Sequence, residues 1–479
     1  MTESWTTLRE LLLPTGTAPD RGVGSAWAQP GRGLERSLRT AIRAGRLRTG
    51  ERLPSTRDLA AQLGVARGTV TAVYRQLLAE GYLEARHGSG TWVADVAPQP
   101  APAAKRPTPK PDRYRLGPGM PSLGAFPRSA WLSALRQGCA ALTDVELGYP
   151  DPAGLLTTRT ELAGYLGRVR GVVTAPAGVV ITHGTFEALN LLCAVLRADG
   201  QTEVAVEDPG NQEQYELLEA RGLRGCPVPV DDEGIRVDAL ARTDCRAVIV
   251  TSAHQYPLGV SLSPARRRAL LDWADSTKGL VIEDDYDAEY RYDRAPVGAL
   301  QAIYPDSVAY VGTLSKTMAP ALRLGWLVPP AGMLDEVVRQ KRLHDRGGSA
   351  LDQAALTHFL QSGGYDRHLR RTRLLYRERR DALLAALAEH LPDWKPLGIA
   401  GGLHLVIQLP NGFDDREVVK HLKAQHIQLS PLSRYARAID LPPGLVVGYA
   451  TLTPARLRSA VQLIAKSMAE LTSGGVNHR

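Results

Sequence analysis

The sequence predicts two folded parts joined by a linker: a mainly α-helical winged helix-turn-helix at the N-terminus and a larger α/β domain built on a mostly parallel sheet. Three observations support this fold class. Three helical patterns are followed by a strand, a glycine turn and a second strand. A proline-rich segment comes next. The rest of the chain alternates buried-strand runs with helical patterns, which is the order of a parallel α/β sheet.

Length and composition narrow the class of protein. The 479 residues are enough for two or three domains, and 44% hydrophobic with 23% charged residues is typical of a soluble globular protein. No apolar run reaches the ~18 residues that a membrane helix needs, and the N-terminal segment lacks the pattern of a secretory signal. We therefore expect a cytoplasmic protein without membrane contacts, whose four scattered cysteines are reduced thiols.

Positive charge is concentrated near the N-terminus. Residues 1–112 contain 16 Lys and Arg against 10 Asp and Glu, which is +6 of the formal net charge of +8. Such an excess favours a polyanion as partner. A solvated basic face would give the same count, so the charge has to be weighed together with the helical patterns.

The three helical patterns have the layout of a helix-turn-helix. The first ends near Gly45, and the second runs from the N-cap candidate Ser55 to Gly64. A short Gly-Val turn leads to the third, in which four apolar residues share one face: Val70, Val73, Tyr74 and Leu77. The segment YLEARHGSGTWVA then predicts a two-stranded wing with a glycine turn.

This layout places specific residues for contact with operator DNA. The first turn of the third helix would enter the major groove, so we expect Arg67 and Thr69 to meet base edges and phosphates. Arg57, in the second helix, is expected at the DNA backbone, and His87 and Gly88 at the tip of the wing. The alternative is a structural helical cap. Three helices, a wing and a basic excess together favour DNA binding.

A proline-rich linker separates the two parts. Residues 97–112, APQPAPAAKRPTPKPD, contain six prolines and no aromatic residue, so they are expected to run as an extended spacer. The predicted organisation is a DNA-binding domain at 1–96, the linker at 97–112 and the α/β domain at 113–479.

The N-terminal domain resembles a known family. The segment GRLRTGERLPSTRDLAAQLGVARGTVTAVYRQLLAEGYLEARHGSGTWVA is similar to the winged-helix domain of the GntR superfamily, with its LPSTR, RGTV and GSGT elements in order. Ala66 stands where the family often has a serine. This removes a hydroxyl that could bind a phosphate but leaves Arg67 beside it.

Five strand-like segments beyond the linker end in polar, glycine or acidic residues. They are GVVITHGT, EVAVEDPG, RAVIVTSAHQYPLG, GLVIEDDYDAEY and SVAYVGTLSK. The ligand site of a parallel α/β sheet lies at the C-terminal ends of its strands, so we expect these endings to converge.

Two of the endings carry a carboxylate and an amine that suit one cofactor. Asp284 follows an apolar strand, where a carboxylate is unfavourable unless a cation such as a protonated pyridine nitrogen faces it. Lys316 is one of nine lysines among 58 basic residues. Its amine forms a Schiff base with an aldehyde, which a guanidinium cannot do. Alone, Asp284 could pair with an arginine and Lys316 could be a surface lysine.

The other endings predict a phosphate site. Gly184 and Thr185 open a helix whose free N–H groups and dipole suit a phosphate, although they would also serve as an ordinary cap. Thr313, Ser315 and Arg323 add two hydroxyls and a fork-shaped cation. A pyridine partner, a phosphate site and an imine-forming lysine, taken together, indicate pyridoxal 5'-phosphate.

A second resemblance covers residues from about 115 to the end. They resemble the fold-type I aminotransferases, and the peptides EDPG, AHQYPLG, EDDYDAEYRYD and GTLSKTMAPALRLG are those of the MocR branch of the GntR family. The resemblance implies an α/β fold-type I domain that binds pyridoxal 5'-phosphate, with a smaller C-terminal α/β subdomain at about 345–479. It also implies a homodimer with the sites at a two-fold interface.

The resemblance assigns roles to individual residues. Lys316 is similar to the lysine that holds the cofactor, Asp284 to the partner of the pyridine nitrogen and Tyr286 to the donor to the O3' oxygen. Three residues match phosphate ligands: Thr313, Ser315 and Arg323. Arg434 matches the arginine that holds an effector carboxylate, although Arg437 lies three residues away.

Several positions depart from the family pattern. Asn211 stands where many members have a tyrosine over the cofactor ring. Glu213 stands where members that sense an ω-amino acid have a second arginine, which argues against that ligand class. Tyr256 replaces the asparagine of aminotransferases, as is usual in the MocR branch. Phe186 and Glu187 replace a commoner pair of glutamines.

Three functions remain open on this basis. The first is a transcriptional regulator that senses pyridoxal 5'-phosphate, alone or with an amino compound, with vitamin B6 metabolism as a plausible target. The second is an active aminotransferase with a DNA-binding domain, and the third is a DNA-binding protein whose large domain only dimerises. The linker favours the first. A catalytic domain gains nothing from an attached DNA-binding domain unless the state of the catalytic domain changes how the DNA-binding domain acts.

Overall fold

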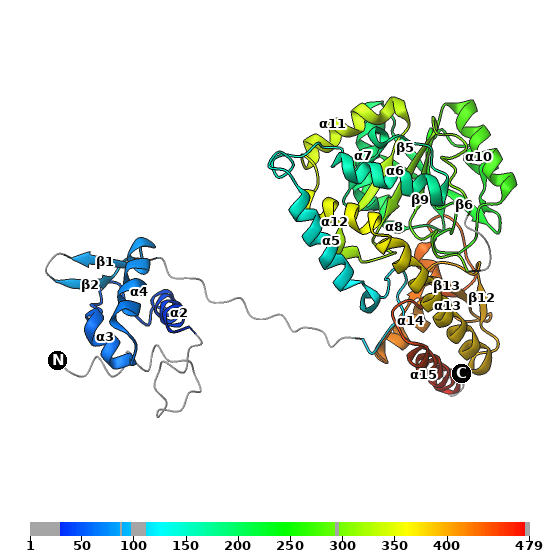
Figure 1. Ribbon diagram of the computed structural model, residues 1–479. Coiled ribbons are helices and arrows are strands. Elements are labelled where there is room, and N and C mark those ends of the chain that lie inside the picture. Colours follow the sequence, from blue (N-terminus) through cyan, green and yellow to red (C-terminus); the bar gives the residue numbers. More distant parts are fainter. Residues whose placement is uncertain (1–28, 87–88, 97–111, 293–296, 475–479) are drawn as a thin grey trace. The chain divides into compact units, whose positions relative to one another are not determined.

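The computed structural model describes residues 29–86, 89–96, 112–292 and 297–474, and the chain divides between Pro109 and Lys110 into two compact units (Figure 1). His87 and Gly88, which were expected at the wing tip, lie outside the described residues, as does nearly all of the proline-rich linker. The two units are therefore described separately.

The first unit is a winged helix, as the sequence predicted. Its elements are α2 (Pro30–Arg43), α3 (Thr56–Leu63), α4 (Arg67–Ala79) and the antiparallel strands β1 (Leu83–Arg86) and β2 (Gly90–Val93). The predicted Ser55 cap is present, since its side chain accepts a hydrogen bond from the Asp58 backbone N–H at 3.2 Å, and Gly64 ends α3 in the left-handed conformation. The four apolar residues predicted for one face of α4 are all buried.

The second unit contains an eight-stranded, mostly parallel sheet. Its order is β4 (Val180–Thr182), β11 (Gly325–Val328), β10 (Val308–Thr313), β9 (Leu280–Asp285), β8 (Ala247–Val250), β5 (Glu203–Asp208), β6 (Arg224–Asp231) and β7 (Gly234–Ile235). β11 is antiparallel to both neighbours, and β7 is antiparallel to β6. All five segments predicted to be strands belong to this sheet.

Helices cover both faces of this sheet, so most of its strands are buried along their whole length, among them β4, β11, β10, β9 and β8. Alternate residues face opposite cores: Val204 and Val206 join one cluster, while Ala205 between them joins another. The surrounding helices are α5 (Arg128–Ala141), α6 (Leu156–Arg170), α7 (Thr185–Ala198), α8 (Gln212–Ala220), α9 (Val237–Leu240), α10 (Pro264–Thr277), α11 (Leu334–His344) and α12 (Ala350–Gln361). Short 3-10 turns are η2 (Leu123–Ala125), η3 (Pro176–Gly178), η4 (Pro320–Leu322) and η5 (Ala331–Met333).

A smaller subdomain forms the C-terminal part of the second unit. Its sheet orders β12 (Lys395–Leu397), β13 (His404–Gln408), β16 (Gly444–Gly448) and β15 (Ser430–Pro431), and it packs with α13 (Gly364–His390), α14 (Asp415–Ala424), α15 (Pro454–Gly474) and η6 (Leu432–Tyr435). The first strand after the linker, β3 (Tyr114–Arg115), pairs in parallel with β14 (Ile427–Gln428). The chain thus enters the second unit along its C-terminal subdomain.

The helix α12 packs on the large part of this unit, although it lies within the residues 345–479 that were expected to form the small subdomain. The rings of Phe359 and Trp131 of α5 pack edge to face at 5.6 Å. The hydroxyls of Thr357 and Thr158 of α6 lie 2.8 Å apart.

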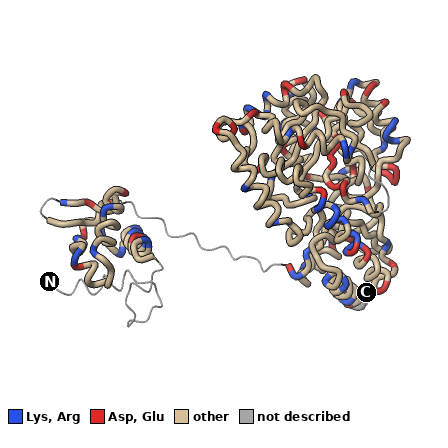
Figure 2. Tube along the Cα trace, viewed as in Figure 1, with Lys and Arg blue, Asp and Glu red and all other residues tan. Residues whose placement is uncertain are grey.

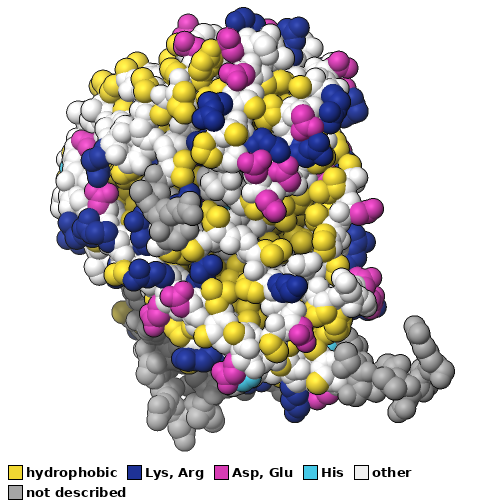
Figure 3. Space-filling model, turned by 90° about the vertical axis from the view of Figure 1, so that its right-hand side faces the viewer, with side chains coloured by type: hydrophobic (Ala, Val, Ile, Leu, Met, Phe, Trp, Pro, Cys, Tyr) yellow, Lys and Arg dark blue, Asp and Glu magenta, His cyan; other side chains and the backbone are white. Residues whose placement is uncertain are grey.

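The described part of the chain holds no helix long and apolar enough to cross a bilayer. On the face drawn in Figure 3, acidic and basic side chains are interspersed with apolar ones rather than separated by sign. This mixture agrees with the small net charge that the sequence assigns to residues 113–479, which carry +2 of the total of +8.

Candidate functional site

A cavity of about 880 Å³ lies at the C-terminal ends of β5, β8, β9 and β10. The convergence predicted from the strand endings is therefore present. The predicted site residues that line this cavity are Thr185, Tyr256, Asp284, Tyr286, Thr313, Ser315, Lys316, Arg323 and Arg434. Residues 117–119, which begin two positions after the end of β3, and Gln428 of β14 also contribute to its wall.

Gly184 is the centre of the predicted phosphate site. It has a positive φ of 87° and forms the N-cap of α7, so the free N–H groups of that helix follow it. A Cβ atom on Gly184 would lie 3.4 Å from Nη1 of Arg323, 3.5 Å from Oγ1 of Thr313 and 3.7 Å from Oγ of Ser315. Two hydroxyls and a guanidinium thus surround a helix start, which fits a phosphate group.

Asp284 is the buried acid of the cavity. Its side chain is 9% exposed, and burial raises its pKa to about 7. Its neighbour Asp285 points to the opposite side of the strand, where it pairs with Arg170 at 2.7 Å and accepts a hydrogen bond from Tyr310 at 2.6 Å. The structure records no such cation for Asp284 among the described residues, and it accepts only a long hydrogen bond from Thr185, at 3.4 Å.

Lys316 lies inside the cavity rather than on the surface. Its Nζ donates a hydrogen bond to the Gly119 carbonyl at 2.9 Å. Burial lowers its pKa, although the carboxylates of Asp284 and Asp287 oppose this change. A lysine with a lowered pKa is more often neutral, which is the form that attacks an aldehyde.

Tyr286 is held by two residues that the sequence reasoning did not single out. Its hydroxyl donates to the His254 carbonyl at 3.0 Å and lies 3.1 Å from Nδ1 of His254. The same Nδ1 lies 2.9 Å from Oδ2 of Asp287. Both residues are almost fully buried, and they stand in the peptides AHQYPLG and EDDYDAEY, so proximity in the sequence was an available signal.

The structure separates the two candidate arginines for an effector carboxylate. Arg434, on η6, is exposed and lines the cavity. Arg437 instead stacks on Tyr215 at 4.4 Å and pairs with Glu219 at 3.0 Å. The Tyr256 hydroxyl donates to that of Tyr435 beside Arg434, at 3.1 Å.

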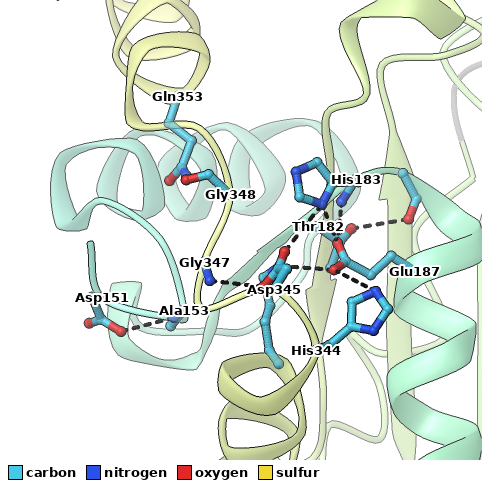
Figure 4. A network of polar contacts seen from close by, with 12 residues as sticks. Asp151, Ala153, Thr182, His183, Glu187, His344, Asp345, Gly347, Gly348 and Gln353 are labelled. Atoms are coloured by element: carbon cyan, nitrogen blue, oxygen red, sulfur yellow. Dashed lines mark hydrogen bonds and ion pairs between the residues drawn. The ribbon is translucent and has the colours of Figure 1, made fainter. Parts of the chain in front are cut away.

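A buried charge network supports the phosphate site from behind, and Glu187 is the one of its members that the sequence analysis singled out. Figure 4 shows His183, Glu187 and Asp345 pointing toward one another. The Lys341 ammonium is fully buried and pairs with Glu187 at 3.0 Å and Asp345 at 2.7 Å. Glu187 also accepts the His183 backbone N–H at 2.5 Å, directly before Gly184. Hydrogen bonds to Asp345 and Glu187 raise the pKa of His183 to about 9.

In the first unit, three of the five residues predicted to contact DNA are described, and they lie in the first turns of α3 and α4. Arg57 and Arg67 are exposed, and Thr69 is half-buried. Arg67 is the first residue of α4, and Figure 2 shows basic positions on α2, α3 and α4. Near the wing, the Arg86 guanidinium lies 4.9 Å from the Trp92 ring.

Comparison with known proteins identifies the family. Residues 30–93 match the bacterial regulatory proteins of the gntR family, and residues 115–464 match the aminotransferases of class I and II. The chain is 34% identical over 469 residues to the probable rhizopine catabolism regulatory protein MocR of Rhizobium meliloti, covering 93% of this chain and 94% of that protein. The chain belongs to the MocR-type regulators of the GntR family. It is accordingly a transcriptional regulator with an aminotransferase-like domain.

Other relatives of this MocR-type chain agree. The HTH-type pyridoxine biosynthesis transcriptional regulator PdxR of Corynebacterium glutamicum is 34% identical, with 87% of this chain and 91% of that protein covered. Among solved structures, an archaeal alanine:glyoxylate aminotransferase has a TM-score of 0.69 at 25% identity, with 74% of this chain and 91% of that chain covered. A kynurenine aminotransferase of Pyrococcus horikoshii, at 24% identity, has a TM-score of 0.68, covers 75% and 91%, and shows the shared fold.

Aminotransferases of class I and II depend on pyridoxal 5'-phosphate, and the MocR-type cavity fits this group. The space at Gly184 that a Cβ would fill is bordered by phosphate-binding side chains. Asp284 is a buried carboxylate that faces the cavity and has no ion pair within the described residues. Lys316 supplies an amine on the wall of the same cavity.

Proposed function

We propose that this regulator senses pyridoxal 5'-phosphate in the cavity of its aminotransferase-like domain and that occupancy alters how its winged helix binds operator DNA. The observation that carries the proposal is the placement of Asp284, Lys316 and the Gly184 turn around one cavity. These groups match the pyridine nitrogen, the aldehyde and the phosphate of that cofactor.

Each residue has a distinct task in the proposed site. When bound, the cofactor supplies an aldehyde that reacts with amines. Lys316 provides the amine, and Asp284 pairs with the protonated pyridine nitrogen. Tyr286 donates to the O3' oxygen, and Tyr256 borders the ring. The phosphate is held by Gly184, Thr185, Thr313, Ser315 and Arg323.

For DNA, we propose that Arg67 and Thr69 contact base edges and Arg57 a phosphate, with His87 and Gly88 at the wing tip. Operator DNA is chromosomal, so the regulator would act in the cytoplasm. The linker at 97–112, between domains at 1–96 and 113–479, would allow two DNA-binding domains to reach inverted or direct repeats. The relative PdxR is a regulator of pyridoxine biosynthesis, which supports a target in vitamin B6 metabolism.

We further propose that the functional particle is a homodimer. Large apolar side chains are exposed on two neighbouring segments of the second unit: Val145, Leu147, Tyr149, Leu156, Leu343 and Leu351. The Arg346 guanidinium lies 5.4 Å from the Tyr149 ring, which brings the segments together. Exposed apolar groups in this number are typical of an interface that a second copy covers.

The test of cofactor sensing combines three measurements on one preparation. Reconstituted wild type should absorb in the visible range, and borohydride should fix the cofactor covalently at Lys316, whereas Lys316→Ala should lose that linkage. An operator titration should then show a different affinity for the apo and reconstituted forms without added amino acid. A protein that stays colourless after addition of the cofactor would contradict the proposal.

The second candidate function is an active aminotransferase tethered to DNA, favoured by the set of cofactor residues that lines the cavity. A coupled transamination assay with common amino donors distinguishes the two. We expect negligible turnover. Equal operator affinity in the apo and reconstituted forms, together with multiple turnovers, would favour the enzyme instead.

A further inference from the structure

The cavity extends past the cofactor residues to the start of α8, where two carboxylates line it. Asn211 is the N-cap of this helix and accepts the Glu213 backbone N–H at 3.2 Å, which fixes where the helix begins. Glu213 and Glu216, three residues apart in the first turns of α8, therefore share a face, and both line the cavity. Within the described chain neither carboxylate has an ion pair.

An unpaired cation stands elsewhere on the wall of the same cavity. Arg434 is exposed on η6, and the described residues include no ion-pair partner for it. Arg434, Glu213 and Tyr256 all line this cavity. Glu213 and Lys316 line the same cavity, and the Glu213 carboxylate is one of the charges that oppose the lowered pKa of Lys316.

These charges are held apart from one another rather than paired. The carboxylates lie in the first turns of a helix, where the helix dipole favours negative charge and makes their presence without a partner less costly. The cavity wall also includes a buried charged side chain, since Asp284, which is 9% exposed, faces it. A ligand that complements this wall must carry a negative group for Arg434 and a positive group for Glu213 and Glu216.

We propose that the cavity takes, beside the cofactor, an α-amino acid whose side chain carries a second cationic group. Arg434 binds its carboxylate, Glu213 and Glu216 bind the distal cation, and the α-amino group faces Lys316. The inference rests on the proposed cofactor site, because the α-amino group is recognised there. An amino acid with a distal carboxylate would meet two like charges and bind poorly.

The test is calorimetric titration of the full-length regulator reconstituted with pyridoxal 5'-phosphate. L-ornithine and L-lysine are compared with L-norvaline and L-norleucine, which have the same carbon chains without the terminal amine. We expect the diamino acids to bind about tenfold or more tightly than their neutral counterparts, with a difference that shrinks as salt is raised. L-glutamate should bind more weakly than L-norvaline.

Variants identify the groups responsible. The double variant Glu213→Gln with Glu216→Gln should lose the preference for diamino acids and leave L-norvaline binding within about twofold. Glu219→Gln is the matched control, because Glu219 lies on the same helix but pairs with Arg437 outside the cavity wall. Arg434→Gln should weaken L-ornithine and leave putrescine, which has no carboxylate, unchanged.

Equal binding of L-ornithine and L-norvaline by wild type, or a preference that survives the double variant, would overturn the inference. The visible absorbance of the Lys316-linked cofactor is recorded before each titration. Its presence without a preference for diamino acids would refute this ligand class and leave cofactor sensing intact. Its absence would refute both.

Discussion

At the scale of single residues, the sequence predicted the chemistry that stands at strand ends and missed the partners that only folding brings close. Lys316 and Asp284 could be predicted because a charged side chain at the end of a buried, apolar strand is unfavourable unless a partner or a ligand compensates it. His254 and Asp287 were missed because each looks like an ordinary polar residue until the buried contact at 2.9 Å is seen. The roles of the cavity residues remain predictions.

The raised pKa of Asp284 predicts that this residue lowers the free energy of unfolding of the apo protein by an amount that depends on pH. An acid with a pKa of about 7 when folded, against 3.8 as its ordinary value, binds more protons folded than unfolded between these values. Stability contributed by this site therefore falls as pH rises from about 4 to 7 and stays low above. Asp284→Asn should stabilise the apo protein by up to roughly 4 kcal/mol at pH 8 and hardly at all at pH 4.

Calorimetric unfolding of apo wild type and Asp284→Asn at the two pH values measures this effect. Glu207 and Glu289, whose pKa values burial also raises to about 7, are present in both proteins, so their contributions cancel in the comparison. A stabilisation that is the same at pH 4 and pH 8 would contradict the explanation by burial of charge.

At the scale of elements, local signals predicted the ends of helices well, whereas long-range pairing was out of reach. Ser55 and Gly64 mark the ends of α3, because a helix cap depends on contacts between residues that lie within a few positions of each other. By contrast, Lys341 reaches Glu187 across 154 positions, and α12 packs on the large part of its unit through residues such as Phe359. No local pattern contains that information.

The network behind Gly184 predicts that Lys341 stabilises the turn between β4 and α7. Lys341→Met leaves Glu187 buried without its lysine, and breaking a buried pair in this way costs about 3–5 kcal/mol. We expect a lower unfolding temperature and weaker binding of pyridoxal 5'-phosphate by titration, because Glu187 also holds the His183 N–H. Lys278→Met, at an exposed pair with Asp275, is the control and should change neither.

The N-terminal helices predict different effects for two arginines. Arg67→Ala, at the first position of α4, should cost roughly 1–3 kcal/mol on operator DNA if it reads a base edge. Arg57→Ala should weaken binding to all sequences and reduce the salt dependence if it meets a phosphate. Fluorescence anisotropy at several salt concentrations measures both, with Arg268→Ala in the second unit as control. Unchanged binding in both variants would mean that another surface contacts DNA.

At the scale of the whole molecule, composition predicted where the chain divides, because six prolines in a short segment cannot form a core. Subunit contacts are harder to predict from sequence, because the apolar residues concerned look like any others until folding leaves them exposed. Tyr149, for example, is 82% exposed, and Val145 is 84% exposed. Such a surface is recognised from the exposed fraction of its side chains in the folded protein, and that fraction cannot be read from the sequence.

The proposed dimer gives a prediction for this surface. Tyr149→Glu combined with Leu343→Glu should convert the dimer to a monomer, because two buried carboxylates per subunit would be left without partners. Light scattering after size-exclusion chromatography measures the mass. Leu374→Glu, at an equally exposed leucine on α13, is the control and should leave the dimer intact. A wild-type protein that is monomeric at all concentrations would refute the proposal directly.

The pairing of β3 with β14 determines where the tether to the DNA-binding domain is fastened. Gln428, on β14, borders the cavity, and Gly119, four residues after β3, accepts the Lys316 hydrogen bond. The anchor of the tether is therefore part of the same wall that the proposed ligands would contact. A ligand that displaces this wall would also displace β3. Only a few residues of backbone separate β3 from the linker, so the displacement would change where the linker leaves the domain.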